Sequence, residues 1–285
     1  MAISGKTRVY GVIGDPIEHS LSPVIHNAAF AALGLESVFL AFRVKPAEVG
    51  NAVSGMRALG IHGLNVTMPH KTTVIPHLDE VDKTARFLNA VNTIHNKNGK
   101  LWGFNTDGVG ALKALRENGV DPKGKKVLLL GAGGASRAIA YTIAHEADEL
   151  VILNRTVKPA KELARQLRQL LPKKISAEAL SPETIEDNLM DSEVLINATS
   201  IGMKPNVNET LVNPKWLRTN LAVMDIVYNP LETKLAKIAK EAGAKVVSGV
   251  EMLIYQGAAS FEIWTGKSAP IQVMRKTALD RLQKV

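Results

Sequence analysis

The sequence contains no cysteine among its 285 residues. This absence excludes disulfide bridges, zinc sites built from thiolates and cysteine nucleophiles, and we expect no metal site. No apolar run approaches the roughly 18 residues of a membrane span, and the residues before Val9 lack the apolar stretch of a secretory signal. We therefore expect a cytoplasmic protein without a membrane partner.

Positive charge is in excess but is not concentrated. The formal net charge of +8 would suit an anionic ligand or nucleic acid. The lysines are instead scattered along helical stretches such as Lys234-Leu-Ala-Lys237-Ile-Ala-Lys240, where the spacing indicates one solvated face. We expect no nucleic-acid partner.

The second half of the chain has the pattern of a doubly wound α/β domain. From Lys125 onward, short apolar runs alternate with amphipathic stretches. Runs that are continuously apolar are typical of strands buried on both faces, so the alternation predicts a parallel sheet of the Rossmann type. The runs are residues 127–130, 150–153, 194–196, 223–227 and 246–247.

The first 107 residues predict another α/β unit, because the chain exceeds the usual size of a single domain. Between Asn92 and Phe104 we expect a hairpin, since Asn98-Gly99 readily supplies the two positive φ angles of a type I′ turn. Strands are expected near residues 8–13, 38–44 and 64–68.

The last part of the chain has helical periodicity and is too long to be only a cap on the last strand. We expect it to return to the first domain. The predicted divisions are residues 1–107 for substrate binding and catalysis, 108–250 for the nucleotide, and 251–285 for the returning helices. No low-complexity linker separates the first two, so the boundary near Asp107–Gly110 should be a connected hinge.

A glycine-rich segment follows the apolar run 127–130 directly and opens a helical stretch. In Gly131-Ala-Gly133-Gly134-Ala-Ser136, Gly131 permits a tight turn, Gly133 lets the backbone approach a pyrophosphate, and the helix N-terminus offers free N–H donors. Ser136 stands where the fingerprint has its third glycine. The alternative is a strand-to-helix turn that binds no ligand.

Arginine stands where an NAD enzyme usually has an acid. The second strand of this half ends in Asn154-Arg155-Thr156, about twenty residues after the glycines. Because arginine can hold a 2′-phosphate by paired, charge-assisted hydrogen bonds, the segment favours NADP over NAD. A solvated arginine at a strand end is the alternative.

Polar groups follow two strands of the first domain. His19-Ser20-Leu-Ser22-Pro23 places two hydroxyls at a helix start, which suits a carboxylate, although Ser22 is also expected to cap that helix. Asn65-Val-Thr67-Met-Pro-His70-Lys71 gathers amide, hydroxyl and amine groups, although Lys71 alone would be consistent with a surface charge and His70 with a structural role. Asp107 adds a carboxylate, or else an N-cap for a helix over residues 109–118.

These segments together resemble the shikimate dehydrogenase family. Each block is modest alone, but all occur in the family's order between residues 9 and 260. The blocks are His19-Ser-Leu-Ser-Pro23, Asn65-Val-Thr-Met-Pro-His-Lys71, Asn89-Ala-Val-Asn-Thr93, Asn105-Thr-Asp-Gly108, Gly131-Ala-Gly-Gly-Ala-Ser136, Asn154-Arg-Thr156, Asn197-Ala-Thr-Ser-Ile-Gly-Met203 and Tyr255-Gln-Gly257.

The resemblance implies roles for individual residues. It assigns proton transfer to Lys71, with Asp107 beside it as the second catalytic residue. The substrate carboxylate would be held by Ser20, Ser22 and Tyr228, and the ring hydroxyls by Thr67, Lys71, Asn92, Asp107 and Gln256. The cofactor would be bound or lined by Gly131, Ala132, Gly133, Gly134, Ala135, Asn154, Arg155, Thr156, Val157, Lys158, Pro159, Thr199, Ile226 and Gly249. Two departures are Lys83, where many relatives have an acid, and Pro159, where a basic residue is frequent.

The implied activity is the reversible NADPH-dependent reduction of 3-dehydroshikimate to shikimate, on the pathway to chorismate and the aromatic amino acids. The active site is expected in a cleft between the two domains of a monomer or homodimer. Two alternatives remain. One is a quinate/shikimate dehydrogenase that also uses NAD; the other is an NADP-binding protein without catalytic activity, because a fold alone does not establish chemistry.

Overall fold

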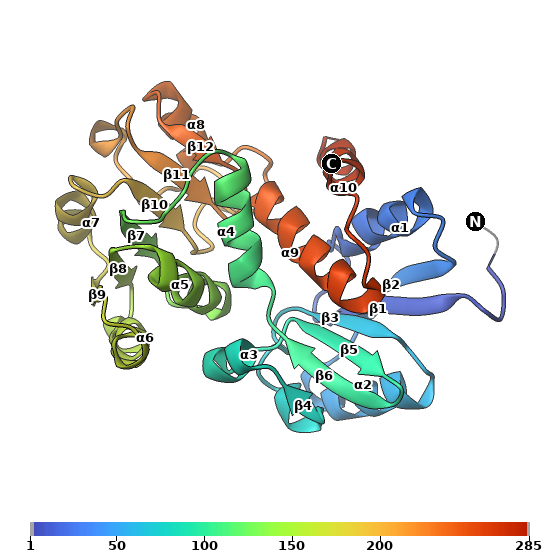
Figure 1. Ribbon diagram of the computed structural model, residues 1–285. Helices are drawn as coiled ribbons and strands as arrows, with labels where there is room; N and C mark the ends of the chain where they lie inside the picture. Colours follow the sequence, from blue (N-terminus) through green and yellow to red (C-terminus); the bar gives the residue numbers. More distant parts are fainter. Residues whose placement is uncertain (1–2, 284–285) are drawn as a thin grey trace. The chain divides into compact units, whose positions relative to one another are not determined.

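The computed structural model describes residues 3–283, which form two compact units (Figure 1). Unit 1 contains the described residues up to Asp107 together with those from Ile254 onward, and unit 2 is the continuous segment Gly108–Leu253. Unit 1 is therefore assembled from both ends of the chain. Among the described residues, no helix is long and apolar enough to cross a membrane.

Unit 1 is built on a mixed six-stranded sheet with the order β2-β1-β3-β5-β6-β4. Strands β1, β2 and β3 are parallel to one another, whereas β5 is antiparallel to both β3 and β6. The strands are β1 Arg8–Gly14, β2 Ser37–Arg43, β3 Gly63–Val66, β4 Glu80–Val81, β5 Thr93–Lys97 and β6 Lys100–Phe104. The helices are α1 Ser22–Ala32, α2 Val49–Ala58, α3 Lys83–Leu88, α9 Gly249–Thr265 (which begins in unit 2) and α10 Ile271–Leu282, with 3-10 turns at Pro46–Glu48 and Ile75–His77.

Two local predictions for unit 1 have different outcomes. The hairpin is confirmed: Asn98 (φ 54°) and Gly99 (φ 87°) both have the positive φ angles of the expected turn. The third predicted strand is wrong at its end, because β3 stops at Val66 and the N–H of His70 closes a turn onto the carbonyl of Thr67 (2.9 Å). Thr67 therefore lies at the start of a loop rather than within the sheet.

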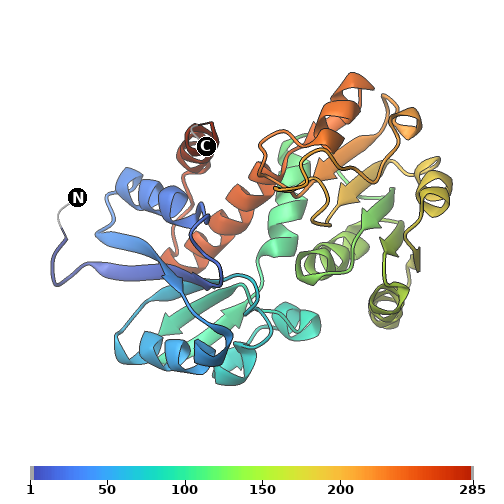
Figure 2. The same cartoon turned by 180° about the vertical axis from the view of Figure 1, so that it is seen from behind.

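The C-terminal helices do return to unit 1, as predicted, and α10 packs against α1 (Figures 1 and 2). The indole N–H of Trp264 on α9 donates to the carbonyl of Ile94 on β5 (2.9 Å). A β-carbon on Gly63 would lie only 2.5 Å from that indole nitrogen, so only glycine leaves room for the tryptophan.

The core beneath these helices contains a buried histidine. His26 on α1 stacks on Phe39 (centroids 4.5 Å apart) and lies beside Trp264. Neither of its ring nitrogens has a hydrogen-bond partner at normal geometry among the described residues. Burial lowers the pKa of His26 to about 3, so its imidazole is neutral.

Unit 2 has a fully parallel sheet with the order β12-β11-β10-β7-β8-β9. Numbered within the unit, this is the 3-2-1-4-5-6 order of dinucleotide-binding folds, with the reversal between β7 and β10. The strands are β7 Lys126–Leu130, β8 Glu149–Asn154, β9 Lys174–Ala179, β10 Val194–Asn197, β11 Ala222–Asp225 and β12 Lys245–Val247. The helices are α4 Asp107–Glu117, α5 Gly134–Glu146, α6 Val157–Leu170, α7 Pro182–Leu189 and α8 Lys234–Glu241, with a 3-10 turn at Pro214–Trp216.

Candidate functional site

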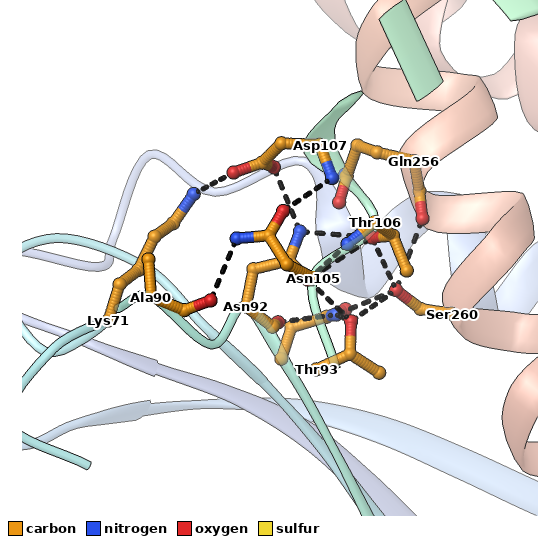
Figure 3. Close-up of polar contacts among 10 residues, drawn as sticks. Lys71, Ala90, Asn92, Thr93, Asn105, Thr106, Asp107, Gln256 and Ser260 are labelled. Carbon is orange, nitrogen blue, oxygen red and sulfur yellow. Dashed lines mark hydrogen bonds and ion pairs between the residues drawn. The ribbon is translucent and has the colours of Figure 1, made fainter. Parts of the chain in front are cut away.

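The acidic and basic groups of unit 1 form a close ion pair. Nζ of Lys71, in the loop after β3, donates to Oδ2 of Asp107 at 2.6 Å (Figure 3). Their side chains are 21% and 8% exposed, so Lys71 is not a freely solvated surface charge. Helix α4 begins at Asp107 itself, whose backbone N–H donates to Oδ1 of Asn105 (3.0 Å), and Asn105 in turn donates to the carbonyl of Ala90.

Asn92 holds the other oxygen of this carboxylate. Its Nδ2 donates to Oδ1 of Asp107 (2.8 Å) and its Oδ1 accepts from the backbone N–H of Thr106 (2.9 Å). Because a backbone N–H can only donate, the amide of Asn92 has one orientation that satisfies both contacts. Each oxygen of Asp107 thus has its own donor, and the amine of Lys71 is kept on one side of the carboxylate.

The two serines lie as expected at the start of α1, but their local roles differ from the prediction. Ser22 is buried and is the first helical residue, so it is not the cap that the sequence suggested. The hydroxyl of Ser20, which is half-buried, accepts instead from the N–H of Ser22 (3.3 Å). Ser20 therefore satisfies one of the free donors of this helix start.

The other predicted residues of unit 1 fall on two elements. Thr67 is half-buried directly after β3, and Gln256 is half-buried on α9 (Figure 3). His70 is buried and its Nε2 donates to the carbonyl of Val44 (2.6 Å), which is a structural role. Lys83 is exposed at the start of α3. Tyr228 belongs to unit 2, where burial raises the pKa of its phenol.

The glycine-rich turn of unit 2 is shaped to admit a ligand. Gly131 has φ 110°, and a β-carbon there would lie 2.8 Å from the carbonyl oxygen of Ala198. A β-carbon on Gly133 or Gly134 would meet nothing within 4 Å. Helix α5 begins at Gly134 without a side-chain cap, so the donors of its first turn remain available for a phosphate group.

Ser136 explains why a third glycine is not needed. It is fully buried, and its hydroxyl donates to the carbonyl of Ala198 (2.9 Å), the residue that follows β10. This bond ties α5 to the end of the neighbouring strand at the reversal of strand order. Open space, free N–H groups and a rigid turn together fit a dinucleotide pyrophosphate.

The segment after β8 presents the predicted cation. Oδ1 of Asn154 accepts from the N–H of Ala132 (3.1 Å), which joins the second strand end to the glycine-rich turn. Arg155 is exposed and makes no hydrogen bond or ion pair with any of residues 3–283, so its guanidinium is available to an external anion. Thr156, Lys158 and Pro159 are also exposed, and Val157 is half-buried.

The remaining predicted cofactor residues lie on the loops after β10 and β11. Thr199 donates to Oδ1 of Asn197 (2.7 Å), and the N–H of Ile226 donates to the carbonyl of Asn197 (3.0 Å). A β-carbon on Gly249 would be 2.5 Å from the carbonyl oxygen of Ile226, so this close approach requires glycine. These contacts gather Thr199, Ile226 and Gly249 at one edge of the sheet of unit 2.

Asp225 was missed by the sequence analysis, although a carboxylate inside an apolar strand is a signal. It is 1% exposed and accepts from Thr233 (2.6 Å), Asn197 (3.0 Å) and the N–H of Val227 (3.1 Å). Burial raises its pKa despite these donors. Asp225 thus fixes the loops that follow β10 and β11. Among the described residues, no group of three or more histidine, aspartate or glutamate side chains could hold a metal ion.

The chain matches known families along most of its length. Residues 12–94 match the shikimate dehydrogenase substrate binding domain, residues 113–246 match shikimate / quinate 5-dehydrogenase, and residues 249–279 match the shikimate 5'-dehydrogenase C-terminal domain. The shikimate dehydrogenase (NADP(+)) of Methanopyrus kandleri is 50% identical over 286 residues, which is 99% of each chain. The chain belongs to the shikimate dehydrogenase family.

Solved structures of shikimate dehydrogenases share the whole fold. One in complex with NADP+ is 45% identical, with a TM-score of 0.92 over 99% of this chain and 98% of that chain. The shikimate 5-dehydrogenase of Listeria monocytogenes, solved with shikimate and NAD, is 40% identical, with a TM-score of 0.92 over 97% and 98%. The likeness to shikimate dehydrogenases therefore extends over both units.

Proposed function

We propose that this chain catalyses the reversible NADPH-dependent reduction of 3-dehydroshikimate to shikimate, a step toward chorismate and the aromatic amino acids. Its membership of the shikimate dehydrogenase family supports the reaction and the use of NADP. The observation that carries the proposal is the ion pair of Lys71 and Asp107, because reduction of a ketone needs one well-placed proton donor.

Proton transfer is assigned to Lys71. The bound nicotinamide would supply a hydride to the ring ketone. The ammonium of Lys71 then donates one proton to the oxygen that becomes the new hydroxyl, and in the reverse direction the amine accepts that proton. Asp107 orients the amine, which is what its separate bonds to Lys71 and Asn92 favour.

Substrate recognition is assigned to polar groups at strand ends and helix starts. We propose that Ser20, Ser22 and Tyr228 hold the ring carboxylate. Ser20 and Ser22 sit where the first turn of α1 adds N–H donors, which suits an anion. The ring hydroxyls are assigned to Thr67, Lys71, Asn92, Asp107 and Gln256.

The cofactor is assigned to unit 2. The pyrophosphate fits the open turn from Gly131 to Ala135, and the 2′-phosphate fits Arg155, whose guanidinium has no protein partner among residues 3–283. Asn154, Thr156, Val157, Lys158 and Pro159 would surround that phosphate and its ribose, while Thr199, Ile226 and Gly249 would line the nicotinamide side.

These assignments give each part of the chain a proposed function. Residues 1–107 would bind substrate, residues 108–250 would bind NADP(H), and residues 251–285 would complete the first part. We propose a monomer or homodimer that works in the cytoplasm.

A single absorbance assay tests the function. Shikimate with NADP+ should give reduced cofactor at the nicotinamide band, and shikimate with NAD+ much less, because Arg155 has no acid beside it that would favour a ribose hydroxyl. Comparable rates with quinate or with NAD+ would indicate a quinate/shikimate dehydrogenase instead. No reduction with either ring would indicate an NADP-binding protein without this activity.

A further inference from the structure

Ser260 is the centre of a buried hydrogen-bond cluster behind the ion pair of Lys71 and Asp107 (Figure 3). The residue is fully buried on α9. Four polar atoms surround its hydroxyl: Oγ1 of Thr93 at 2.8 Å, Nδ2 of Asn65 at 3.0 Å, the carbonyl of Gln256 at 3.1 Å and Oγ1 of Thr106 at 3.3 Å. An ordinary helical serine needs only one of these partners.

The chemistry of the partners sets the direction of the bonds. Nδ2 of Asn65 can only donate, so Ser260 accepts from Asn65. The single proton of Ser260 can go to the carbonyl of Gln256 or to Oγ1 of Thr93, and the remaining lone pair of Ser260 can accept from the hydroxyl of Thr106. Ser260 is therefore within hydrogen-bond distance of both threonine hydroxyls and restricts their rotation.

Both threonines also contact the side-chain oxygen of Asn92. Oγ1 of Thr93 donates to Oδ1 of Asn92 (2.9 Å), and Oγ1 of Thr106 lies 3.2 Å from the same oxygen. Oγ1 of Thr106 accepts in addition from Nδ2 of Asn92 (2.9 Å). The two threonines thus hold the amide plane from which Asn92 reaches Asp107.

We propose that Ser260 is a positioning residue for proton transfer, acting through Thr93 and Thr106 on Asn92 and so on the pair of Asp107 and Lys71. This inference rests on the proposed function. Ser260 touches neither Lys71 nor Asp107, and its role is to keep one oxygen of Asp107 on Asn92 while the other stays on Lys71. Loss of its hydroxyl frees the threonine rotors and loosens that carboxylate.

The test is Ser260→Ala, which removes one oxygen and suits a helix. Because the neutral hydrogen bonds of this one hydroxyl are lost and their effect reaches the ion pair only through Thr93, Thr106 and Asn92, we expect kcat for shikimate oxidation to fall about fivefold, with the KM for NADP+ changed less than about twofold. The matched control is Ser192→Ala. Ser192 is also fully buried and donates to the carbonyl four residues earlier (2.6 Å), but it lies in unit 2 outside the cluster, so kcat should be retained.

A second comparison separates positioning from a merely structural role. In a Lys71→Met background the group to be positioned is absent, so adding Ser260→Ala should change the residual rate less than about twofold. If Ser260→Ala is poorly folded, Ser260→Cys keeps a weak donor at similar size and should show an intermediate kcat.

The outcomes are distinct for the two proposals. Wild-type protein that does not oxidise shikimate would remove the proposed function. An active wild type with unchanged kcat in Ser260→Ala overturns the role of Ser260 and leaves the proposed function standing. A loss that persists unchanged in the Lys71→Met background also overturns it, because the effect would then not pass through the ion pair.

Discussion

Nζ of Lys71 donates to Oδ2 of Asp107 at 2.6 Å although 36 residues separate them in the sequence. The lysine comes from the turn that ends β3 and the aspartate from the first position of α4. Neither position suggests a charged surface pair, because both side chains are mostly buried. Two opposite charges held together in this way are oriented relative to each other before any ligand binds.

Removal of the amine should therefore affect the chemical step. We expect Lys71→Met to lower kcat by about 10²–10⁴-fold, the usual contribution of a general acid or base, with the Kd for NADP+ nearly unchanged. Steady-state kinetics and cofactor titration measure the two effects. Lys45→Met, at an exposed lysine of the same unit, is the control. Turnover near the wild-type level in Lys71→Met would exclude this residue from proton transfer.

Variants of the two serines at the start of α1 should distinguish an effect on shikimate binding from an effect on protein stability. We expect Ser20→Ala with Ser22→Ala to raise the KM for shikimate while the KM for NADP+ stays constant. The stability loss, about 1 kcal/mol, should come mainly from Ser20, whose hydroxyl accepts from the N–H of Ser22. Thermal melts of the single variants measure this division. A folded double variant with unaltered KM would limit both hydroxyls to a structural role.

Cofactor choice should depend on Arg155. We expect Arg155→Asp to weaken NADP+ use by about tenfold to a hundredfold, because a charge-assisted bond to the 2′-phosphate is lost and repulsion is added. NAD+ lacks that phosphate and should be affected much less. The measurement is kcat/KM for both cofactors at saturating shikimate.

A charge change alone should not reproduce this shift. Arg281→Asp, at an exposed arginine of α10, alters the net charge equally and is the control. Lys158 and Thr156 are exposed beside Arg155 and could retain part of the phosphate contact. A constant ratio of NADP+ to NAD+ efficiency in Arg155→Asp would mean that this residue does not select the cofactor.

Acid should destabilise the protein partly through His26. Its pKa is about 3 in the folded protein and 6.5 when unfolded, so the unfolded state binds more protons between these values. The contribution of His26 to the free energy of unfolding is therefore fully present above the unfolded pKa. It is lost as the pH falls below that value, by up to about 1.4 kcal/mol per pH unit. Burial also lowers the pKa of His62 and His95, which adds to the same trend.

Substitution of His26 measures its contribution to the pH dependence of the unfolding free energy. We expect His26→Leu, a replacement of similar size, to reduce the slope of the unfolding free energy against pH between about 6.5 and 4.5 by up to one bound proton. Urea unfolding at several pH values gives the slope. His145→Leu, at an exposed histidine, is the comparison. An identical slope in wild type and His26→Leu would show that His26 is not protonated on unfolding in this range.

Features that depend on local pattern could be predicted from the sequence. The turn at Asn98-Gly99 follows from two residues that tolerate positive φ, and Gly131 was expected at a turn that indeed has φ 110°. The buried strands β7, β8, β10 and β11 of unit 2 each contain a continuous apolar run. Strand β9 was missed because it is an edge strand whose sequence, KISAEA, alternates polar and apolar residues and lacks such a run.

Features that depend on distant packing could not be predicted in this way. Asn65 and Ser260 are 195 residues apart, and nothing in the apolar periodicity of α9 distinguishes Ser260 as the centre of a polar cluster. The capping role expected of Ser22 was also wrong, since the helix begins at Ser22 itself, one residue before the expected start, and helix ends are decided by capping geometry.

The assembly of unit 1 from both ends of the chain has a consequence for folding during synthesis. Unit 2 is one continuous segment, so it can close its parallel sheet while the chain is still being made. Unit 1 cannot complete its core in this way, because Gly63 and Ile94 pack against Trp264. This tryptophan is synthesised 170 residues after Ile94. The first strands to leave the ribosome are thus among the last to be covered, and until α9 arrives their apolar face is available to chaperones or to neighbouring chains.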